Sequence, residues 1–355
     1  FTTLKAEGDL GNFILLLILY TLQGIPMGLS GSIPMILQNN NVSYTDQAIF
    51  SLVSWPFSLK LLWAPLVDSV YSNTFGRRKT WLIPVQLICG IMMIVISFSV
   101  DDLVGNNGVN PDIKTLTWVF FILYFLMATQ DIAVDGWALT MLSTKNVTYA
   151  STANSVGQTL GYFTSYIIFM AFNSIDFSNR FRSIPIDEPL LHLSQFMFFW
   201  GAIFILVTIF VWFFKQEKHT TESPYSITLA YQQMISILKK KNVQLLALIL
   251  FTCKIAFAAS DSITSLKLLD QGIPREHLVI MSVIMMPFGM IIPIFITKYT
   301  NGPKPLSFFL KGYLPRVLVA LLSAFIVYYV PTKQLSQQNI PYSFYALALL
   351  ISLIG

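Results

Sequence analysis

Charged residues are scarce in this sequence. Only 11% of its 355 residues are Asp, Glu, Lys or Arg, whereas 55% are hydrophobic. Soluble domains carry about 25% charged residues, so the composition excludes an ordinary soluble fold and predicts an all-α, polytopic membrane protein. The net charge of +5 does not indicate nucleic-acid binding. Its basic residues lie in short clusters between apolar runs, as in the loops of membrane proteins. We therefore expect a lipid bilayer, and no nucleic acid, as its partner.

Residues that carry catalysis or bind metals are also few. The two cysteines, Cys89 and Cys253, lie far apart and within apolar runs, so we interpret them as buried thiols rather than a disulfide framework. The three histidines lie in or next to loops. We find no metal-ligand cluster, no phosphate-binding glycine loop followed by Lys-Ser/Thr, and no nucleophile–base pair. The sequence therefore predicts no enzyme, no cofactor and no metal site.

The ends of the chain lack two further features. No signal peptide is visible at the N-terminus. The apolar segment from Tyr342 to Gly355 is shorter than the roughly 20 residues that span a bilayer. On this basis we expect the chain to be part of a longer protein, without its leader and its C-terminal helices.

Long apolar runs are abundant, and they predict nine full spans and the start of a tenth. The runs are Asn12–Leu37, Ser43–Tyr71, Thr80–Phe98, Leu116–Leu142, Tyr149–Phe172, Leu193–Phe214, Val243–Lys267, His277–Ile296 and Leu306–Val330, and another begins near Pro341. Six spans, a basic linker and further spans are typical of a transporter with two helical halves. We therefore predict an N-terminal six-helix half at 1–214, a linker at 215–242, and an incomplete second half at 243–355.

The loops indicate the orientation of the chain. One set of loops holds most of the lysines and arginines, including Arg77–Lys79 and Lys239–Lys241. Cytoplasmic loops carry such an excess, so we predict a multi-pass protein with a cytoplasmic N-terminus. In the linker, the stretch from Tyr225 to Lys241 has apolar residues at helical spacing. This pattern predicts an amphipathic helix on the cytoplasmic membrane surface.

Lys60 lies inside the second predicted span, where hydrocarbon would surround it, and Pro56 and Pro65 interrupt the helix on either side. A charge at the centre of a membrane helix costs roughly 2.5–3.5 kcal/mol or more, so it is usually paired and functional. Lys60 is a candidate to bind an anionic substrate. Equally, it could be neutralised by Asp131 or Asp135, which share one face of the fourth span. For these two aspartates we favour a gating ion-pair network, with proton coupling through one of them as the alternative.

The stretch from Asp68 to Lys79 resembles the loop between the second and third helices of the major facilitator superfamily. It departs from that motif because seven residues separate Asp68 from Gly76. Asp68 could pair with Arg77 or Arg78, and these residues together with Lys79 could hold a cytoplasmic gate closed. The alternative is that Arg77, Arg78 and Lys79 only fix the topology and touch lipid headgroups.

Further polar side chains within apolar spans could line a substrate cavity. Asn154, Gln158 and Tyr162 recur every four residues on the fifth span and could instead form interhelical hydrogen bonds. The charged residues of the second half, Lys254, Asp261 and Arg316, could contact an anion near the midplane or neutralise one another. The candidates are Gln23, Asn154, Gln158, Tyr162, Lys254, Asp261 and Arg316.

Five segments together resemble the acetyl-coenzyme A transporter family of the endoplasmic reticulum, a branch of the major facilitator superfamily related to bacterial muropeptide permeases. These segments are residues 42–48, 55–68, 75–79, 128–142 and 154–159. The resemblance implies a twelve-helix fold in the endoplasmic reticulum membrane. It also implies import of cytosolic acetyl-CoA by alternating access, which feeds acetylation in the lumen.

For such a substrate, the intramembrane cations would suit its phosphates, and Trp55 and Trp63 could stack on its adenine or only pack. Two alternatives stay open, a carrier of another large anionic solute, muropeptide-like or nucleotide-like, and a membrane-embedded acyltransferase. Uniport, exchange for CoA and proton coupling also stay open, as do a monomer and a homodimer.

Overall fold

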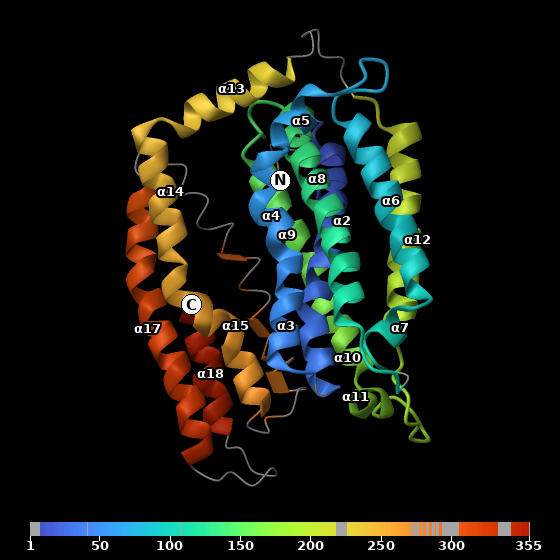
Figure 1. Ribbon diagram of the computed structural model, residues 1–355, viewed down its shortest axis with the longest axis vertical. Helices are drawn as coiled ribbons and strands as arrows, with labels where there is room; N and C mark the ends of the chain where they lie inside the picture. The colour runs from blue at the N-terminus through green and yellow to red at the C-terminus, as the bar shows by residue number, and fades with distance from the viewer. Residues whose placement is uncertain are drawn as a thin grey trace. The chain divides into compact units, whose positions relative to one another are not determined.

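The computed structural model describes residues 8–40, 42–106, 108–217, 226–270, 305–332 and 342–354, with residue 273 and isolated positions between 277 and 292. The described residues form helices and the turns and loops that connect them (Figure 1). The chain divides into two units, Phe1–Met234 and Ile235–Gly355. The division falls within the predicted linker, while the assignment of each unit to one half of a transporter remains a prediction.

Four long helices frame the first unit. They are α2 (Leu10–Asn39), α6 (Lys79–Ser97), α8 (Ile113–Met141) and α12 (Leu193–Phe214), and each is long and apolar enough to cross a membrane. Their ends confirm the corresponding predicted spans, and the largest difference is at α8, which begins at Ile113 instead of Leu116. The chain is therefore an all-α, multi-pass membrane protein.

The predicted second span is not one continuous helix. It consists of α3 (Tyr44–Phe50), η1 (Ser51–Ser54), α4 (Trp55–Leu59), η2 (Lys60–Leu62) and α5 (Ala64–Ser69). Pro65 has no backbone N–H to donate, so the α-helical ladder cannot pass through it. The amide of Trp63 instead donates to the carbonyl of Lys60 at 3.3 Å, which is a tighter, 3₁₀-type bond. The predicted interruption around Lys60 is thus confirmed.

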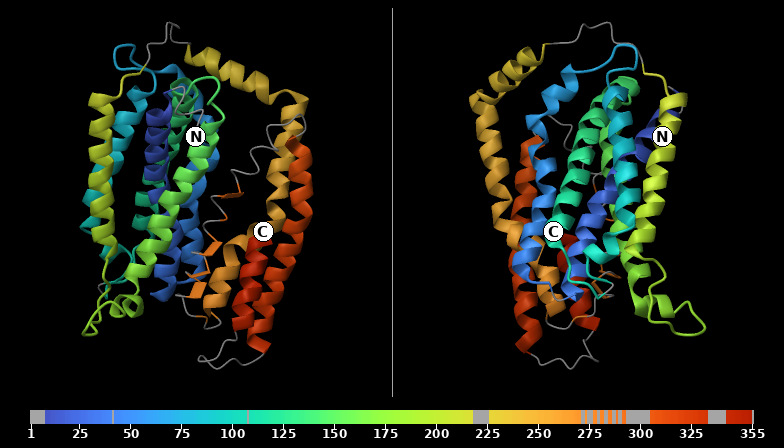
Figure 2. Two further views of the ribbon diagram at one scale, coloured as in Figure 1. Left: turned by 180° about the vertical axis from the view of Figure 1, so that it is seen from behind. Right: turned by 45° about the vertical axis from the view of Figure 1, so that its right-hand side comes forward.

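Helix α9 (Tyr149–Phe163) packs along α2 (Figure 2). It continues through the π-helical turn η3 (Thr164–Ile168) into α10 (Phe169–Asn173). Glycines at four-residue spacing line this contact, Gly24 and Gly28 on α2 and Gly157 and Gly161 on α9, and Gly24 faces Gly161 directly. A Cβ atom at Gly161 would lie 2.7 Å from the Cα of Gly24. The two backbones therefore touch directly, as small-residue motifs permit in membrane helices.

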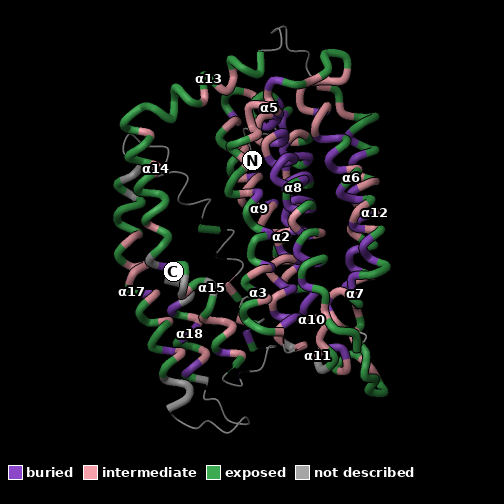
Figure 3. Tube along the Cα trace, viewed as in Figure 1, coloured by how far each residue is buried: buried purple, intermediate pink, exposed green. Residues whose placement is uncertain are grey.

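Helices α6 and α12 also approach closely at one pair of facing glycines, Gly90 and Gly201. A Cβ atom at Gly90 would lie 2.9 Å from the carbonyl oxygen of Gly201, and one at Gly201 would lie 2.8 Å from that of Gly90. Burial concentrates on α2 and α8, whereas α12 alternates buried and exposed residues (Figure 3). The short helices α7 (Val100–Leu103) and α11 (Ile175–Asn179) belong to the loops that join the long helices.

The second unit contains α14 (Lys241–Cys253), α15 (Ile255–Asp270), α17 (Pro305–Thr332) and α18 (Tyr342–Ile354). The predicted seventh span is broken at Lys254, between α14 and α15. The predicted eighth span, His277–Ile296, falls mostly outside the described residues. The predicted linker helix is present as α13 (Ile227–Leu238), with exposed apolar side chains at Ile227, Leu229 and Ile235. Its placement on the membrane surface stays a prediction.

Candidate functional site

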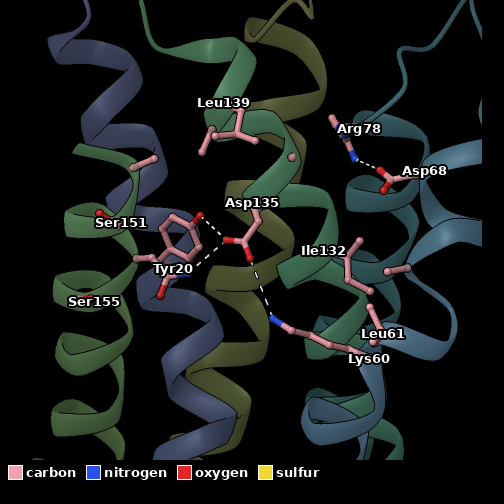
Figure 4. Close-up of a pocket in the computed structure, with 15 residues that line it drawn as sticks. Tyr20, Lys60, Leu61, Asp68, Arg78, Ile132, Asp135, Leu139, Ser151 and Ser155 are labelled. Carbon is pink, nitrogen blue, oxygen red and sulfur yellow. Dashed lines mark hydrogen bonds and ion pairs between the residues drawn. The ribbon is translucent and has the colours of Figure 1, made fainter. Parts of the chain in front are cut away.

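The candidate site is a cavity of about 690 Å³ in the first unit. Its walls come from α2, from the broken segment η2–α5, from α8 and from α9, and one arginine of the loop before α6 reaches it. Figure 4 shows Asp135 near Lys60 and Tyr20, with the Arg78–Asp68 pair bordering the same cavity. The lining residues are Tyr20, Lys60, Leu61, Ala64, Asp68, Arg78, Ile132, Asp135, Gly136, Ala138, Leu139, Ala150, Ser151, Asn154 and Ser155.

Lys60 reaches the cavity from the break in the second span. Its ammonium group forms an ion pair with Asp131 and lies 4.0 Å from Oδ2 of Asp135. A helix without the break at Pro65 would carry a continuous α-helical ladder through this position. These ion pairs agree with the alternative that the aspartates of the fourth span neutralise Lys60. A contact between Lys60 and a substrate stays a prediction.

The two aspartates have different surroundings, although both lie on α8. The side chain of Asp131 is only 3% exposed, whereas that of Asp135 is 46% exposed. Oδ1 of Asp135 accepts hydrogen bonds from the Tyr20 hydroxyl at 2.7 Å and from the Asn154 amide at 3.2 Å. Gln158 approaches Asp131 Oδ1 at 3.5 Å. Two members of the predicted polar stripe on the fifth span thus face these carboxylates.

A second ion pair borders the cavity. The Arg78 guanidinium donates to Oδ1 of Asp68 at 2.5 Å, while Arg77 donates to the backbone carbonyl of Asp68 at 3.1 Å. The Arg78 guanidinium occupies the space that a side chain at Gly136 of α8 would need. The predicted pairing of Asp68 is therefore confirmed, while its role as a gate remains a prediction.

The start of α6 is joined to the end of α12 by two sets of hydrogen bonds. The Glu217 carboxylate accepts from the backbone amides of Arg78, at 2.9 Å, and Lys79, at 3.1 Å. In return, the Lys79 ammonium group donates to the carbonyls of Trp212 and Lys215, both at 2.9 Å. A carboxylate at a helix N-terminus and a cation at a C-terminus both satisfy unpaired backbone groups. Lys79 therefore fastens two helix ends here, while its role in the gate remains a prediction.

Other candidates of the first unit lie away from this cavity. The Trp63 indole donates to the Thr129 hydroxyl at 3.1 Å, and its ring packs on Phe125 with a centroid distance of 4.8 Å. Trp55 is 55% exposed. Gln23 is completely buried, and its amide has no hydrogen-bond partner among the described residues. The Tyr162 ring stacks on Tyr166 at a centroid distance of 5.2 Å.

The candidates of the second unit form a separate group. The Arg316 guanidinium donates to both carboxylate oxygens of Asp261, at 2.6 and 2.7 Å, and lies 5.6 Å from the centre of the Phe257 ring. Lys254 is exposed at the break between α14 and α15. Asp261 thus pairs with Arg316, an arrangement that spacing along one helix could not indicate.

Sequence reasoning missed three residues that shape these contacts, namely Tyr20, Gly136 and Glu217. Tyr20 lies in an apolar run, where a tyrosine usually only packs against its neighbours. Gly136 alone does not predict which side chain occupies the space beside it. The region before Lys79 offered one signal. Helix α6 begins with Arg78 in the capping position, without a side-chain cap of its own, so an external acceptor was to be expected. Within the described residues, His, Cys, Asp and Glu form no group of three that could hold a metal ion.

Comparison with known proteins adds a family assignment. The sequence model of a family described as acetyl-coenzyme A transporter 1 matches residues 12–225 and 219–308. An uncharacterized membrane protein of Saccharomyces cerevisiae is 38% identical over 349 residues, which cover 85% of this chain and 62% of that protein. An uncharacterized protein of Schizosaccharomyces pombe is 38% identical over 321 residues, covering 90% of this chain and 61% of that protein.

A more distant similarity links the chain to bacterial permeases. The anhydromuropeptide permease of Escherichia coli is 27% identical over 152 residues, covering 42% of this chain and 29% of that protein. The chain spans about three fifths of the length of the two fungal relatives.

Proposed function

The chain belongs to the acetyl-coenzyme A transporter family, and from this premise we propose that it moves acetyl-CoA across a membrane by alternating access. The proposed direction is from the cytosol into the lumen of the endoplasmic reticulum, with the N-terminus in the cytosol. The observation that carries the proposal is the position of Lys60. This cation lies in a break within the membrane-spanning part, at the wall of a cavity of about 690 Å³.

The chemistry of the substrate fits such a cavity in outline. Acetyl-CoA carries several phosphate charges, and an ammonium group can bind a phosphate oxygen by a charge-assisted hydrogen bond. In the structure, Lys60 is held by Asp131 and faces Asp135. Substrate binding would therefore exchange a carboxylate partner of Lys60 for a phosphate, so that the site returns to an ion-paired state once the substrate leaves.

The network between α6 and α12 supports the alternating-access part of the proposal. Glu217 and Lys79 fasten the ends of these two helices. The Arg78 guanidinium pairs with Asp68 and packs against Gly136 of α8. Transporter halves move largely as rigid bodies around a fixed site. We propose that these contacts keep the first unit rigid, and that the Asp68–Arg78 pair contributes to the cytoplasmic gate.

A second candidate function is a carrier of another large anionic solute. The similarity to the anhydromuropeptide permease favours keeping this possibility. The membrane-embedded acyltransferase is not proposed further, because the family consists of carriers rather than enzymes.

Uptake of radiolabelled acetyl-CoA by proteoliposomes that contain the purified full-length protein tests the proposal. We expect saturable uptake that CoA inhibits more strongly than ATP or an anhydromuropeptide does. Stronger inhibition by the anhydromuropeptide would favour the second candidate. Vesicles with folded protein that take up no more acetyl-CoA than protein-free vesicles would exclude the proposed substrate.

A further inference from the structure

The charged groups around Lys60 do not balance. Asp68 is a separate group, because it pairs with Arg78 at 2.5 Å and with Arg77 at 3.8 Å. One cation, Lys60, then faces two carboxylates, those of Asp131 and Asp135. Around Lys60, one positive and two negative groups give this group of three a net charge of −1 when all are ionised. An anionic substrate would therefore approach an anionic cluster, and like charges repel strongly in surroundings of low dielectric constant.

Only one of the carboxylates is placed to remove this excess charge. Asp131 is 3% exposed and pairs with Lys60, so cavity water has little access to its carboxylate. Asp135 is 46% exposed and lines the cavity, where water can reach it. The two aspartates, although one helical turn apart, therefore have separate tasks.

The oxygens of Asp135 are also unlike each other. Oδ1 accepts from the Tyr20 hydroxyl of α2, at 2.7 Å, and from the Asn154 amide of α9, at 3.2 Å. Oδ2 lies 4.0 Å from the Lys60 ammonium group, beyond hydrogen-bond distance. A proton from cavity water can therefore be added to Oδ2 while both hydrogen bonds to Oδ1 stay intact. The bonds from Tyr20 and Asn154 hold the carboxylate in place in both protonation states.

We propose that Asp135 is the proton-coupling residue of this carrier, and that one proton travels with each anionic substrate molecule; this inference rests on the proposed function. The proton binds to Oδ2 of Asp135 and makes the cluster neutral. Lys60 then keeps Asp131 as its carboxylate partner and offers its remaining donor capacity to a substrate phosphate. After the site opens to the other side, the phosphate leaves, Oδ2 releases its proton to water, and the starting charges return.

The proposal predicts a dependence of transport on the proton gradient. Proteoliposomes with the full-length protein would be given radiolabelled acetyl-CoA outside, with the exterior either more acidic than the interior or equal to it. We expect several-fold faster uptake under the inward proton gradient. A pH-sensitive dye trapped in the vesicles should report acidification only when acetyl-CoA is present.

Two variants, Asp135→Asn and Tyr20→Phe, connect this behaviour to Asp135, and Asp187→Asn serves as their control. Asp135→Asn should take up acetyl-CoA at a rate that ignores the gradient and should not acidify the vesicles. Asp187→Asn, which changes an exposed carboxylate outside the cavity lining, should behave like the unmodified protein. Tyr20→Phe removes one hydrogen bond to the carboxylate and should move the pH at which uptake falls to half its maximum to a higher value. This second variant keeps the test available if Asp135→Asn does not fold.

The outcomes separate the two levels of the proposal. Uptake by the unmodified protein that is equal with and without the gradient overturns proton coupling and leaves the transport of acetyl-CoA standing. Uptake by Asp135→Asn that still follows the gradient overturns the assignment to this residue. Absence of any uptake by folded, unmodified protein overturns the proposed function and the coupling together.

Discussion

Replacing Lys60 by methionine tests what this lysine does. The substitution keeps the length of the side chain and removes its charge, which leaves Asp131 without its cation. Breaking a fully buried ion pair costs about 3–5 kcal/mol, and an exposed pair contributes less than about 1 kcal/mol. Lys60 is 36% exposed and Asp131 only 3% exposed. We therefore expect Lys60→Met to destabilise the protein by about 2 kcal/mol, between the two limits.

A double variant separates pairing from substrate binding. In Lys60→Met with Asp131→Asn, the uncompensated carboxylate is gone, so most of the lost stability should return. Transport should not return, because the cation that binds phosphate is still absent. A hydrogen bond to a charged group contributes about 1.5–3 kcal/mol, so we expect KM to rise roughly 10- to 100-fold. Lys60→Arg, which keeps the charge, serves as the matched control.

Thermal unfolding of the purified protein and uptake by proteoliposomes measure these two effects independently. If the double variant regained transport together with stability, Lys60 would be only a partner of Asp131. The phosphate site would then have to lie elsewhere.

Three further predictions concern the scaffold. Gly161→Ala should lower the free energy of unfolding by about 1–3 kcal/mol, because the added methyl group meets the α2 backbone. Gly11→Ala, where no atom lies within 4 Å of the added carbon, should not lower it. Equal unfolding temperatures of the two variants would refute the close packing. Glu217→Ala removes the cap of α6 and should cost about 1 kcal/mol in thermal unfolding, whereas an unchanged protein would show that the cap is dispensable. Burial alone would raise the pKa of the Asp9 carboxyl, but hydrogen bonds from Ser143 and Asn146 outweigh it and lower that pKa. The stability that ionised Asp9 contributes should therefore be complete above the pKa of the unfolded state, about 3.9, and should be lost as the pH falls through the lower pKa of the folded state. Measurements of unfolding against pH should show this loss in the unmodified protein and not in Asp9→Asn.

The long helices could be predicted from the sequence because their apolar runs are uninterrupted. Helix α12 occupies the predicted Leu193–Phe214, and α6 is shifted by one residue from its prediction. Pro56 and Pro65 also indicated correctly that the second span is broken around Lys60. The cost of an intramembrane charge indicated that Lys60 has a partner, but the sequence left open whether that partner is a substrate anion or an aspartate of the fourth span.

The remaining contacts depend on which helices become neighbours. Tyr20 donates to Asp135, a residue 115 positions later in the chain, and Glu217 caps a helix that begins 138 positions earlier. Neither residue belongs to a local pattern. Their spacing predicts that Lys254 and Asp261 share a helix face, yet Lys254 lies at the break before α15 and Asp261 pairs with Arg316 of α17. Spacing along one helix identifies a shared face but does not identify what packs against it.

The most direct test of phosphate recognition compares two substrates in one uptake experiment. Acetylpantetheine carries the same acetyl thioester as acetyl-CoA but lacks its phosphates and its adenosine. We predict that proteoliposomes take up acetyl-CoA at a saturable rate and take up acetylpantetheine no faster than protein-free vesicles do. Equal protein-dependent uptake of the two compounds would contradict a site built around Lys60 for an anionic substrate.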